Sequence, residues 1–149
     1  MKVVVQRVLE AHCDVAGKPT VSIGPGLLLY VSFRREDTVM QCAKMAQKIA
    51  KLRIFSDAQD KLNLSAHDLG KEVLVISQFT LEGNTQKGHR PSFTEAMNPV
   101  EAERLFSVFV EDLRALLPTV KKGFFQEHMN ITSNNDGPVT LLLESTVMP

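Results

Sequence analysis

Two short segments of the sequence carry side chains that could bind a substrate and assist a reaction. Residues 77–80, Ser-Gln-Phe-Thr, place two hydroxyls and an amide just after an apolar run. These groups donate and accept hydrogen bonds, so they could form the polar floor of a pocket. Residues 135–140 contain a Gly-Pro pair, and X-Pro peptide bonds are the only ones that readily become cis. A cis Gly137-Pro138 bond would point its carbonyls in an unusual direction, but the sequence leaves the isomer open.

Each segment also has a purely structural interpretation. The polar groups of residues 77–80 could satisfy backbone groups at the end of a strand. Residues 135–140, Asn-Asp-Gly-Pro-Val-Thr, have the composition of a turn between two strands. On residue types alone, the structural interpretations are favoured over the functional ones.

The usual signatures of catalytic and metal sites are missing from the sequence. It contains no GxSxG, GxxxxGK[ST], HExxH or GxGxxG motif. The four histidines lack the i, i+4 spacing or the nearby cysteine of a metal site, and Cys13 and Cys42 form no CxxC pair. The sequence therefore predicts no metal centre, favours no serine triad, and is typical of a protein with two reduced, buried thiols.

The elements of the first half must position residues 77–80. The expected order is a strand over 3–15, a turn at 17–19, a short strand at 21–23, a second turn at 24–26 and an apolar strand at 27–33. Together these suggest an antiparallel meander. Apolar residues then recur at helical spacing from Asp37 through Phe55, with Asp37 available as the N-cap. Residues 72–79 are continuously apolar and predict a central strand buried on both faces.

A long loop and a second helix separate the two segments. Residues 80–97 contain two glycines, a proline and a basic cluster, and long loops in compact domains are often functional. Asn98-Pro99 then reads as the N-cap and first position of a helix that Pro118 ends. The remaining elements are strands at 119–125, 129–133 and 139–144, with a turn at 134–138. The pattern predicts a single α+β domain over 1–149, with a largely antiparallel, barrel-like sheet and two main helices.

Composition restricts the partners of this chain. It has 17 Lys plus Arg against 17 Asp plus Glu and a pI near 6.9. Proteins that bind long stretches of nucleic acid usually carry a positive surplus, so extended backbone binding is disfavoured. No signal peptide or membrane-spanning run is visible, and the cytoplasm is the expected compartment.

Several ordered motifs together resemble one known family, the D-aminoacyl-tRNA deacylases. The matching segments are residues 4–8 (VVQRV), 23–28 (IGPGLL), 52–55 (LRIF), 77–81 (SQFTL), 87–93 (KGHRPSF) and 135–140 (NDGPVT). The resemblance spans the whole chain. It implies a cytoplasmic homodimer of barrel-like subunits that cleaves the ester joining a D-amino acid, or glycine mischarged on tRNA(Ala), to the 3′-terminal adenosine of tRNA. Ser77 and Asp136 favour the chirality-editing branch over a sister branch that edits L-alanine.

The resemblance also implies roles for individual residues. Ser77, Gln78, Phe79 and Thr80 match the catalytic pocket motif, in which backbone N–H groups hold the oxyanion of ester hydrolysis. Gly137 and Pro138 match a cis Gly-Pro pair that enters the partner subunit's pocket and excludes L side chains. Arg7 matches the arginine that braces this pair, although on residue type alone it could be a surface charge. Phe125 and Met129 match the adenosine-binding region, and a core role for Phe125 is equally open.

The implied mechanism uses no metal, no cofactor and no side-chain nucleophile. Water attacks the ester while the 2′-hydroxyl of the tRNA assists proton transfer.

A second hypothesis is a non-catalytic dimeric module that binds a nucleotide or an RNA end. In either case the local positive surface comes from Lys87, His89, Arg90, Lys121 and Lys122, so we expect weak, salt-sensitive binding of tRNA with few phosphate contacts.

Overall fold

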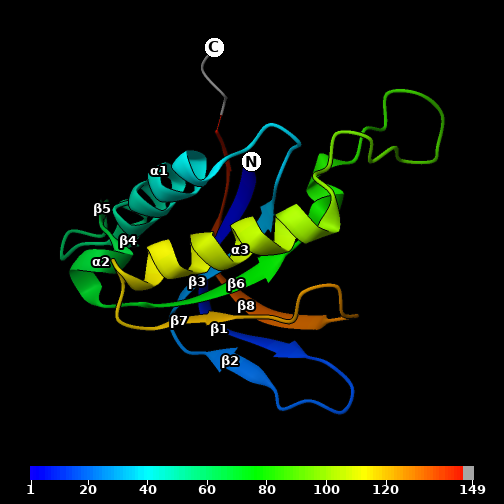
Figure 1. The fold of residues 1–149 in the computed structure, drawn as a ribbon. Coiled ribbons are helices and arrows are strands. Elements are labelled where there is room, and N and C mark those ends of the chain that lie inside the picture. Colours follow the sequence, from blue (N-terminus) through cyan, green and yellow to red (C-terminus); the bar gives the residue numbers. More distant parts are fainter. Residues whose placement is uncertain (146–149) are drawn as a thin grey trace.

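The computed structural model describes residues 1–145 of the chain. Its strands are β1 (Lys2–Asp14), β2 (Val21–Ile23), β3 (Gly26–Ser32), β4 (Phe55–Ser56), β5 (Leu62–Leu64), β6 (Glu72–Ser77), β7 (Val120–Lys122) and β8 (Asn130–Glu144). Its helices are α1 (Val39–Ala50), α2 (Ala66–Leu69), α3 (Pro99–Arg114) and the 3₁₀ helix η1 (Phe79–Glu82). Helices α1 and α3 lie side by side over one face of the main sheet (Figure 1). The predicted α+β class with two main helices is confirmed.

The main sheet is built around β1. Its strand order is β2-β1-β3-β6-β7, and β8 pairs with the other edge of β1. The pairs of β1 are antiparallel, whereas β3–β6 and β6–β7 are parallel. The sheet curls into a nearly closed, barrel-like shape, as predicted.

The predicted meander is wrong, because β2 and β3 both pair with β1 and not with each other. In register, Ala11 of β1 faces Ile23, and Val8 faces Gly26. The two strands therefore form one arm of a hairpin, which Gly24-Pro25 interrupts. Proline cannot donate to the ladder, so the arm breaks at this pair without reversing direction.

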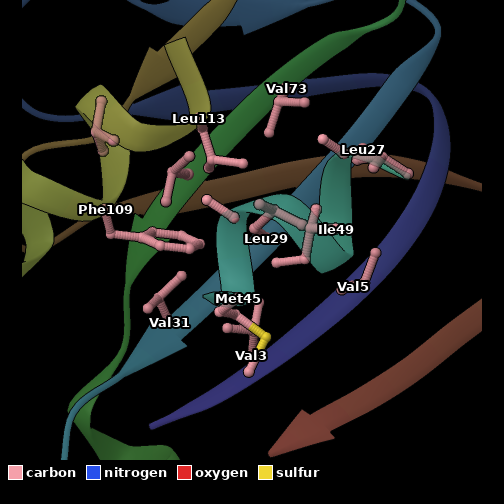
Figure 2. Packing of buried hydrophobic residues seen from close by; sticks show 14 of the residues in the cluster. Val3, Val5, Leu27, Leu29, Val31, Met45, Ile49, Val73, Phe109 and Leu113 are labelled. Carbon is pink, nitrogen blue, oxygen red and sulfur yellow. The ribbon is translucent and has the colours of Figure 1, made fainter. Parts of the chain in front are cut away.

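Strands β3 and β6 are buried on both faces, which explains their continuous apolar runs. In β3, Leu27 and Leu29 face the core beneath the helices, together with Ile49 and Phe109 (Figure 2). Leu28 instead joins a second cluster on the opposite face of the sheet. The predicted central strand is thus confirmed, although it ends at Ser77 and not at Phe79.

The helix predictions hold in position but not in every boundary. Helix α3 begins with Asn98 as N-cap and Pro99 at its first position, as expected. Helix α1 ends at Ala50, five residues before the predicted end, and Phe55 starts the small β4–β5 sheet. Its N-cap is Thr38, in a capping box with Gln41, because the Asp37 carboxylate instead accepts hydrogen bonds from the backbone of Arg34 and the amino group of Met1.

The predicted turn at 134–138 is also wrong, since β8 is one strand over its whole length. It pairs with β1 from Lys2↔Glu144 to Asp14↔Asn130, with register shifts between Gln6 and Val8 and between Val8 and Glu10. Gln6 faces Thr140 and Val8 faces Asn135, so four residues of β8 bulge out opposite Arg7. The Asn135 side chain stabilises this bulge by donating to the carbonyls of Arg7 and Val139, at 2.9 and 3.1 Å.

Candidate active site

A pocket of about 660 Å³ opens where the parallel strands β3 and β6 end and α3 begins. Its wall consists of residues 30–33, 76–79, 97, 99, 102, 125–129 and 131. Small-molecule sites commonly have this volume and a mostly apolar lining. The pocket brings together five of the nine predicted site residues: Ser77, Gln78, Phe79, Phe125 and Met129.

The end of β6 turns sharply into η1, and this turn presents backbone N–H groups. The N–H of Gln78 donates to the carbonyl of Val31 at 2.8 Å, which fixes the start of the turn on β3. The first bond of the 3₁₀ turn runs from the N–H of Leu81 to the carbonyl of Gln78. The N–H groups of Phe79 and Thr80 precede that bond, so the turn itself offers them no acceptor. They are suited to bind an anionic oxygen.

Thr80 does not line the pocket. Its hydroxyl donates to Oε1 of Gln78 at 2.7 Å. This hydrogen bond orients the Gln78 amide beside the pocket floor. The side chain of Thr80 therefore acts on a pocket residue, while its backbone N–H belongs to the turn.

Phe79 and Phe125 both line the pocket. The ring of Phe79 is 58% exposed and packs edge-on against Phe93, with ring centroids 5.2 Å apart. The ring of Phe125 is partly buried and lies 6.0 Å from that of Phe106 on α3. Phe125 therefore contacts both the core and the cavity, so its two predicted roles are compatible.

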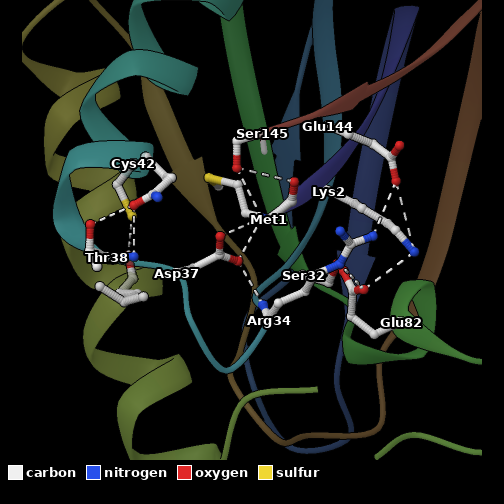
Figure 3. A network of polar contacts seen from close by, with 12 residues as sticks. Met1, Lys2, Ser32, Arg34, Asp37, Thr38, Cys42, Glu82, Glu144 and Ser145 are labelled. Carbon is white, nitrogen blue, oxygen red and sulfur yellow. Dashed lines mark hydrogen bonds and ion pairs between the residues drawn. The ribbon is translucent and has the colours of Figure 1, made fainter. Parts of the chain in front are cut away.

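The buried carboxylate of Glu82, the last residue of η1, fixes this 3₁₀ helix to its neighbours. Glu82 accepts hydrogen bonds from Ser32 at 2.6 Å and from Arg34 at 2.9 Å, and its carboxylate lies 3.3 Å from Nζ of Lys2 (Figure 3). Lys2 also donates to the carbonyl of Leu81 at 2.9 Å. Burial opposes ionisation of Glu82, but these donors outweigh burial and lower its pKa. The charged network thus anchors the turn that presents the N–H groups of Phe79 and Thr80.

The remaining predicted residues form a second cluster, outside this pocket. The Gly137-Pro138 bond is cis, and Gly137 has φ +120°. Arg7 lies opposite this pair on β1. Its Nε is 3.0 Å from the Asp136 carboxylate, so the two side chains form an ion pair, but the N–H of Nε is not aligned for a hydrogen bond. Nη1 of Arg7 donates to the carbonyl of Ile54 at 2.8 Å. Arg7, Gly137 and Pro138 do not line the pocket of their own chain.

Sequence reasoning missed part of the pocket wall. Tyr30, Met97 and Ala102 line the cavity but come from elements distant in sequence from residues 77–80. Tyr30 is the only tyrosine of the chain and interrupts an apolar strand, which was a signal that could have been used. Burial raises the pKa of its phenol, so it stays protonated at neutral pH.

Residues 1–145 contain no group of three or more His, Cys, Asp or Glu side chains arranged to hold a metal ion. Over the same residues, no helix combines the length and apolar character needed to cross a membrane. Cys13 and Cys42 are both buried and unpaired, as predicted, and burial raises the pKa of Cys42 to about 12.

The chain is a small α+β domain with a mostly apolar pocket at the carboxyl ends of two parallel strands. The model of the D-Tyr-tRNA(Tyr) deacylase family matches residues 4–144. Proteins named D-aminoacyl-tRNA deacylase from Alkaliphilus metalliredigens and Thermotoga petrophila are 49% and 47% identical, over 97% and 98% of both chains. The chain belongs to this family and is an enzyme, a deacylase.

Two solved structures share the fold of this chain. The structure named c-Myc DNA Unwinding Element Binding Protein has a TM-score of 0.92 and 39% identity, covering 99% of this chain and 100% of that one. A probable eukaryotic D-amino acid tRNA deacylase has a TM-score of 0.84 at 16% identity, covering 95% and 97% of the two chains. The second likeness concerns the fold alone.

Proposed function

We propose that this enzyme hydrolyses the ester of D-aminoacyl-tRNA, and of glycyl-tRNA mischarged on tRNA(Ala), and spares L-aminoacyl-tRNA. The observation that carries the proposal is the turn at residues 77–80, which borders a pocket of suitable size and leaves the backbone N–H groups of Phe79 and Thr80 without an acceptor in the turn. The curated relatives, which match nearly the full chain, carry the name of this activity. Proofreading of this kind would keep D-residues out of proteins.

In the proposed reaction, water attacks the ester carbonyl carbon and the bond to the 3′-oxygen breaks. The products are the free amino acid and tRNA with a 3′-hydroxyl. The N–H groups of Phe79 and Thr80 stabilise the negative charge that develops on the carbonyl oxygen. The 2′-hydroxyl of the terminal ribose assists proton transfer, and Ser77 and Gln78 orient the ester. Neither a metal, a cofactor nor a side-chain nucleophile takes part.

Selectivity in this proposal comes from exclusion. A carbonyl of Gly137-Pro138, fixed against the Cα of the substrate, accepts a weak C–H contact from a D-residue or glycine. An L side chain would collide with that carbonyl. A filter of this kind does not contact the side chain of a D-substrate, so many D-amino acids are accepted. Arg7 braces the pair through the Asp136 carboxylate.

The proposal requires a homodimer, because Gly137 and Pro138 lie outside the pocket of their own chain. Both are exposed, and so are Leu9 on β1 and Leu141 and Leu142 on β8, at 48%, 38% and 57%. Within residues 1–145, strand β8 pairs with β1 and with no other strand. An apolar edge of this kind favours association, and two-fold symmetry would bring each Gly-Pro pair to the other subunit's pocket.

Phe125 and Met129 are proposed to hold the terminal adenosine. Both line the pocket, and the ring of Phe125 is fixed by its contact with Phe106. Aromatic faces commonly stack on unpaired bases. The base would then lie on one side of the pocket and the ester at the turn of residues 77–80 on the other.

The deciding experiment compares the hydrolysis of D-tyrosyl-tRNA, glycyl-tRNA(Ala) and L-tyrosyl-tRNA. We expect the first two to be hydrolysed, the third to be spared, and a chelator to change nothing. Equal rates for both enantiomers would refute the proposal. The competing hypothesis of a non-catalytic binding module predicts tight binding of the tRNA 3′ end with no release of amino acid, so the same assay distinguishes the two.

A further inference from the structure

The loop of residues 84–92 projects from the end of the molecule where α3 begins (Figure 1). Two backbone hydrogen bonds close its base: Asn84 N–H to the Ser92 carbonyl at 2.8 Å, and Ser92 N–H to the Asn84 carbonyl at 2.9 Å. Oδ1 of Asn84 also accepts from the N–H of Gln86 at 2.9 Å. The loop is therefore an arm with a defined base.

This arm carries a concentrated positive charge. Lys87, His89 and Arg90 are all exposed, and residues 83–94 include no Asp or Glu. Over residues 1–145, these three side chains make no ion pair or hydrogen bond, whereas Lys121 donates to the carbonyl of Ser22 at 2.6 Å. Because the whole chain has no net charge, this local surplus stands out.

Acidic groups lie at the base of the arm. Glu36, Glu82 and Glu95 line a recess of about 420 Å³ beside residues 83–86. Glu82 is buried and paired with Lys2 and Arg34, so its charge is compensated. Glu36 and Glu95 line the recess at the base and not the tip, residues 87–90, so the tip keeps its excess of positive charge.

The base of the arm packs against the pocket wall. Phe93, the residue after the closing pair, makes its edge-on contact with Phe79. Gly83, at the other end, lies so close that a Cβ there would be 3.0 Å from the Phe93 ring. A polymer whose end occupies the pocket would therefore leave it near the arm.

We propose that residues 84–92 bind the phosphates of the tRNA strand that adjoins the 3′-terminal adenosine, through Lys87 and Arg90. This inference rests on the proposed function and deepens it. The arm supplies affinity for tRNA, and the pocket supplies the chemistry. Each phosphate contact releases counterions, so the arm makes binding steeply dependent on salt.

The first test measures the binding of uncharged tRNA, which needs no catalysis. The double variant Lys87→Ala/Arg90→Ala should bind about tenfold more weakly at moderate salt, and its plot of log affinity against log salt should be shallower by about two units. The matched control is Lys44→Ala/Lys48→Ala, which removes the same charge from the exposed face of α1. The control should keep wild-type affinity, and an equal loss in both variants would overturn the proposal.

The second test compares two substrates. The arm variant should lose about tenfold in kcat/KM for D-tyrosyl-tRNA, mainly through KM, and keep the wild-type rate on D-tyrosyl-adenosine, which has no adjoining phosphates. Equal losses on both substrates would show that the change damages the pocket. A change in sedimentation would assign the arm to a contact between copies of the chain. Both results overturn the proposal. If the wild type is inactive but the arm variant still binds tRNA more weakly than the wild type, only the proposed function is refuted.

Discussion

Gly137 holds a backbone conformation that residues with a side chain rarely adopt. Its φ is +120°, and a Cβ would lie 3.0 Å from Nη2 of Arg7 and from Cγ2 of Val139. Gly137→Ala should therefore shift the Gly-Pro carbonyls and lower kcat/KM for D-tyrosyl-tRNA at least about tenfold, or permit hydrolysis of the L-ester. Wild-type rate and selectivity in this variant would remove Gly137 from the chiral filter.

The control for this change is Gly17→Ala. Gly17 also has a positive φ, +76°, but a Cβ there meets nothing within 4 Å. It reports the cost of backbone strain at a turn remote from the Gly-Pro pair. Thermal unfolding of both variants separates a loss of folding from a loss of selectivity.

The Thr80 hydroxyl makes one exposed hydrogen bond, to Gln78. Removing such a bond costs about 0.5–1.5 kcal/mol, so Thr80→Ala should retain activity within about tenfold of the wild type. The backbone N–H, which the proposed mechanism uses, is unchanged by this substitution. Complete loss of turnover with normal folding and tRNA binding would instead indicate that the side chain is catalytic.

Glu82 links stability to pH. Its pKa in the folded protein lies below the ordinary 4.5, so the stability that its charge contributes is present above that value and is lost as pH falls through the folded pKa. Glu82→Gln should lower the free energy of unfolding by about 1–3 kcal/mol at neutral pH, with a smaller difference in acid. Urea unfolding at both pH values measures this, with exposed Glu95→Gln as control. If Glu82→Gln lowers the free energy of unfolding by the same amount at both pH values, the charge of Glu82 has no role in stability.

At the scale of elements, the contact between β3 and β6 depends on Gly26. A Cβ at this position would overlap the carbonyl oxygen of Glu72 on the neighbouring strand, whereas one at Gly24 meets nothing within 4 Å. Gly26→Ala should therefore destabilise the protein by about 1–3 kcal/mol or more, and Gly24→Ala far less. Urea unfolding measures both. Equal losses of unfolding free energy in the two variants would mean that the close approach of the Glu72 backbone to Gly26 does not matter for stability.

The same elements show what a sequence pattern can and cannot predict. Helix α3 was predictable because Asn98, Pro99 and its apolar stripe are local signals. The course of β8 was not, because residues 134–138 have a turn-like composition, and only the long edge of β1 keeps them in one strand. Likewise, the break at Gly24-Pro25 looks like a reversal until its pairing with β1 is known.

The candidate site was predictable to a similar degree. Residues 77–79, Phe125 and Met129 do meet in one pocket. The side chains of residues 77–80 already suggested a pocket floor, whereas only the family resemblance singled out Phe125 and Met129. Residue types alone favoured ordinary structural roles, because a site built from backbone N–H groups leaves little trace in side-chain chemistry. Ala102 reaches the same cavity through tertiary packing, which no local pattern encodes.

At the scale of the whole molecule, the central question is which subunit supplies the Gly-Pro pair. Arg7, Asp136 and Gly137 form a cluster that does not line the pocket of their own chain. If the partner completes the site, two variants that are impaired in different parts of it should complement each other on D-tyrosyl-tRNA. Gly137→Ala damages the filter, and Ala102→Trp fills the pocket, which Ala102 lines from α3.

Refolding these two variants together should restore activity, because each mixed dimer contains one intact pocket facing one intact Gly-Pro pair. With random pairing, about half of the dimers are mixed and have one working site in two, so about a quarter of wild-type turnover is expected. Sedimentation and mass spectrometry confirm that mixed dimers have formed. If they form and are no more active than the separate variants, the filter and the pocket do not meet across the interface, because a site built within one chain would be defective in both subunits.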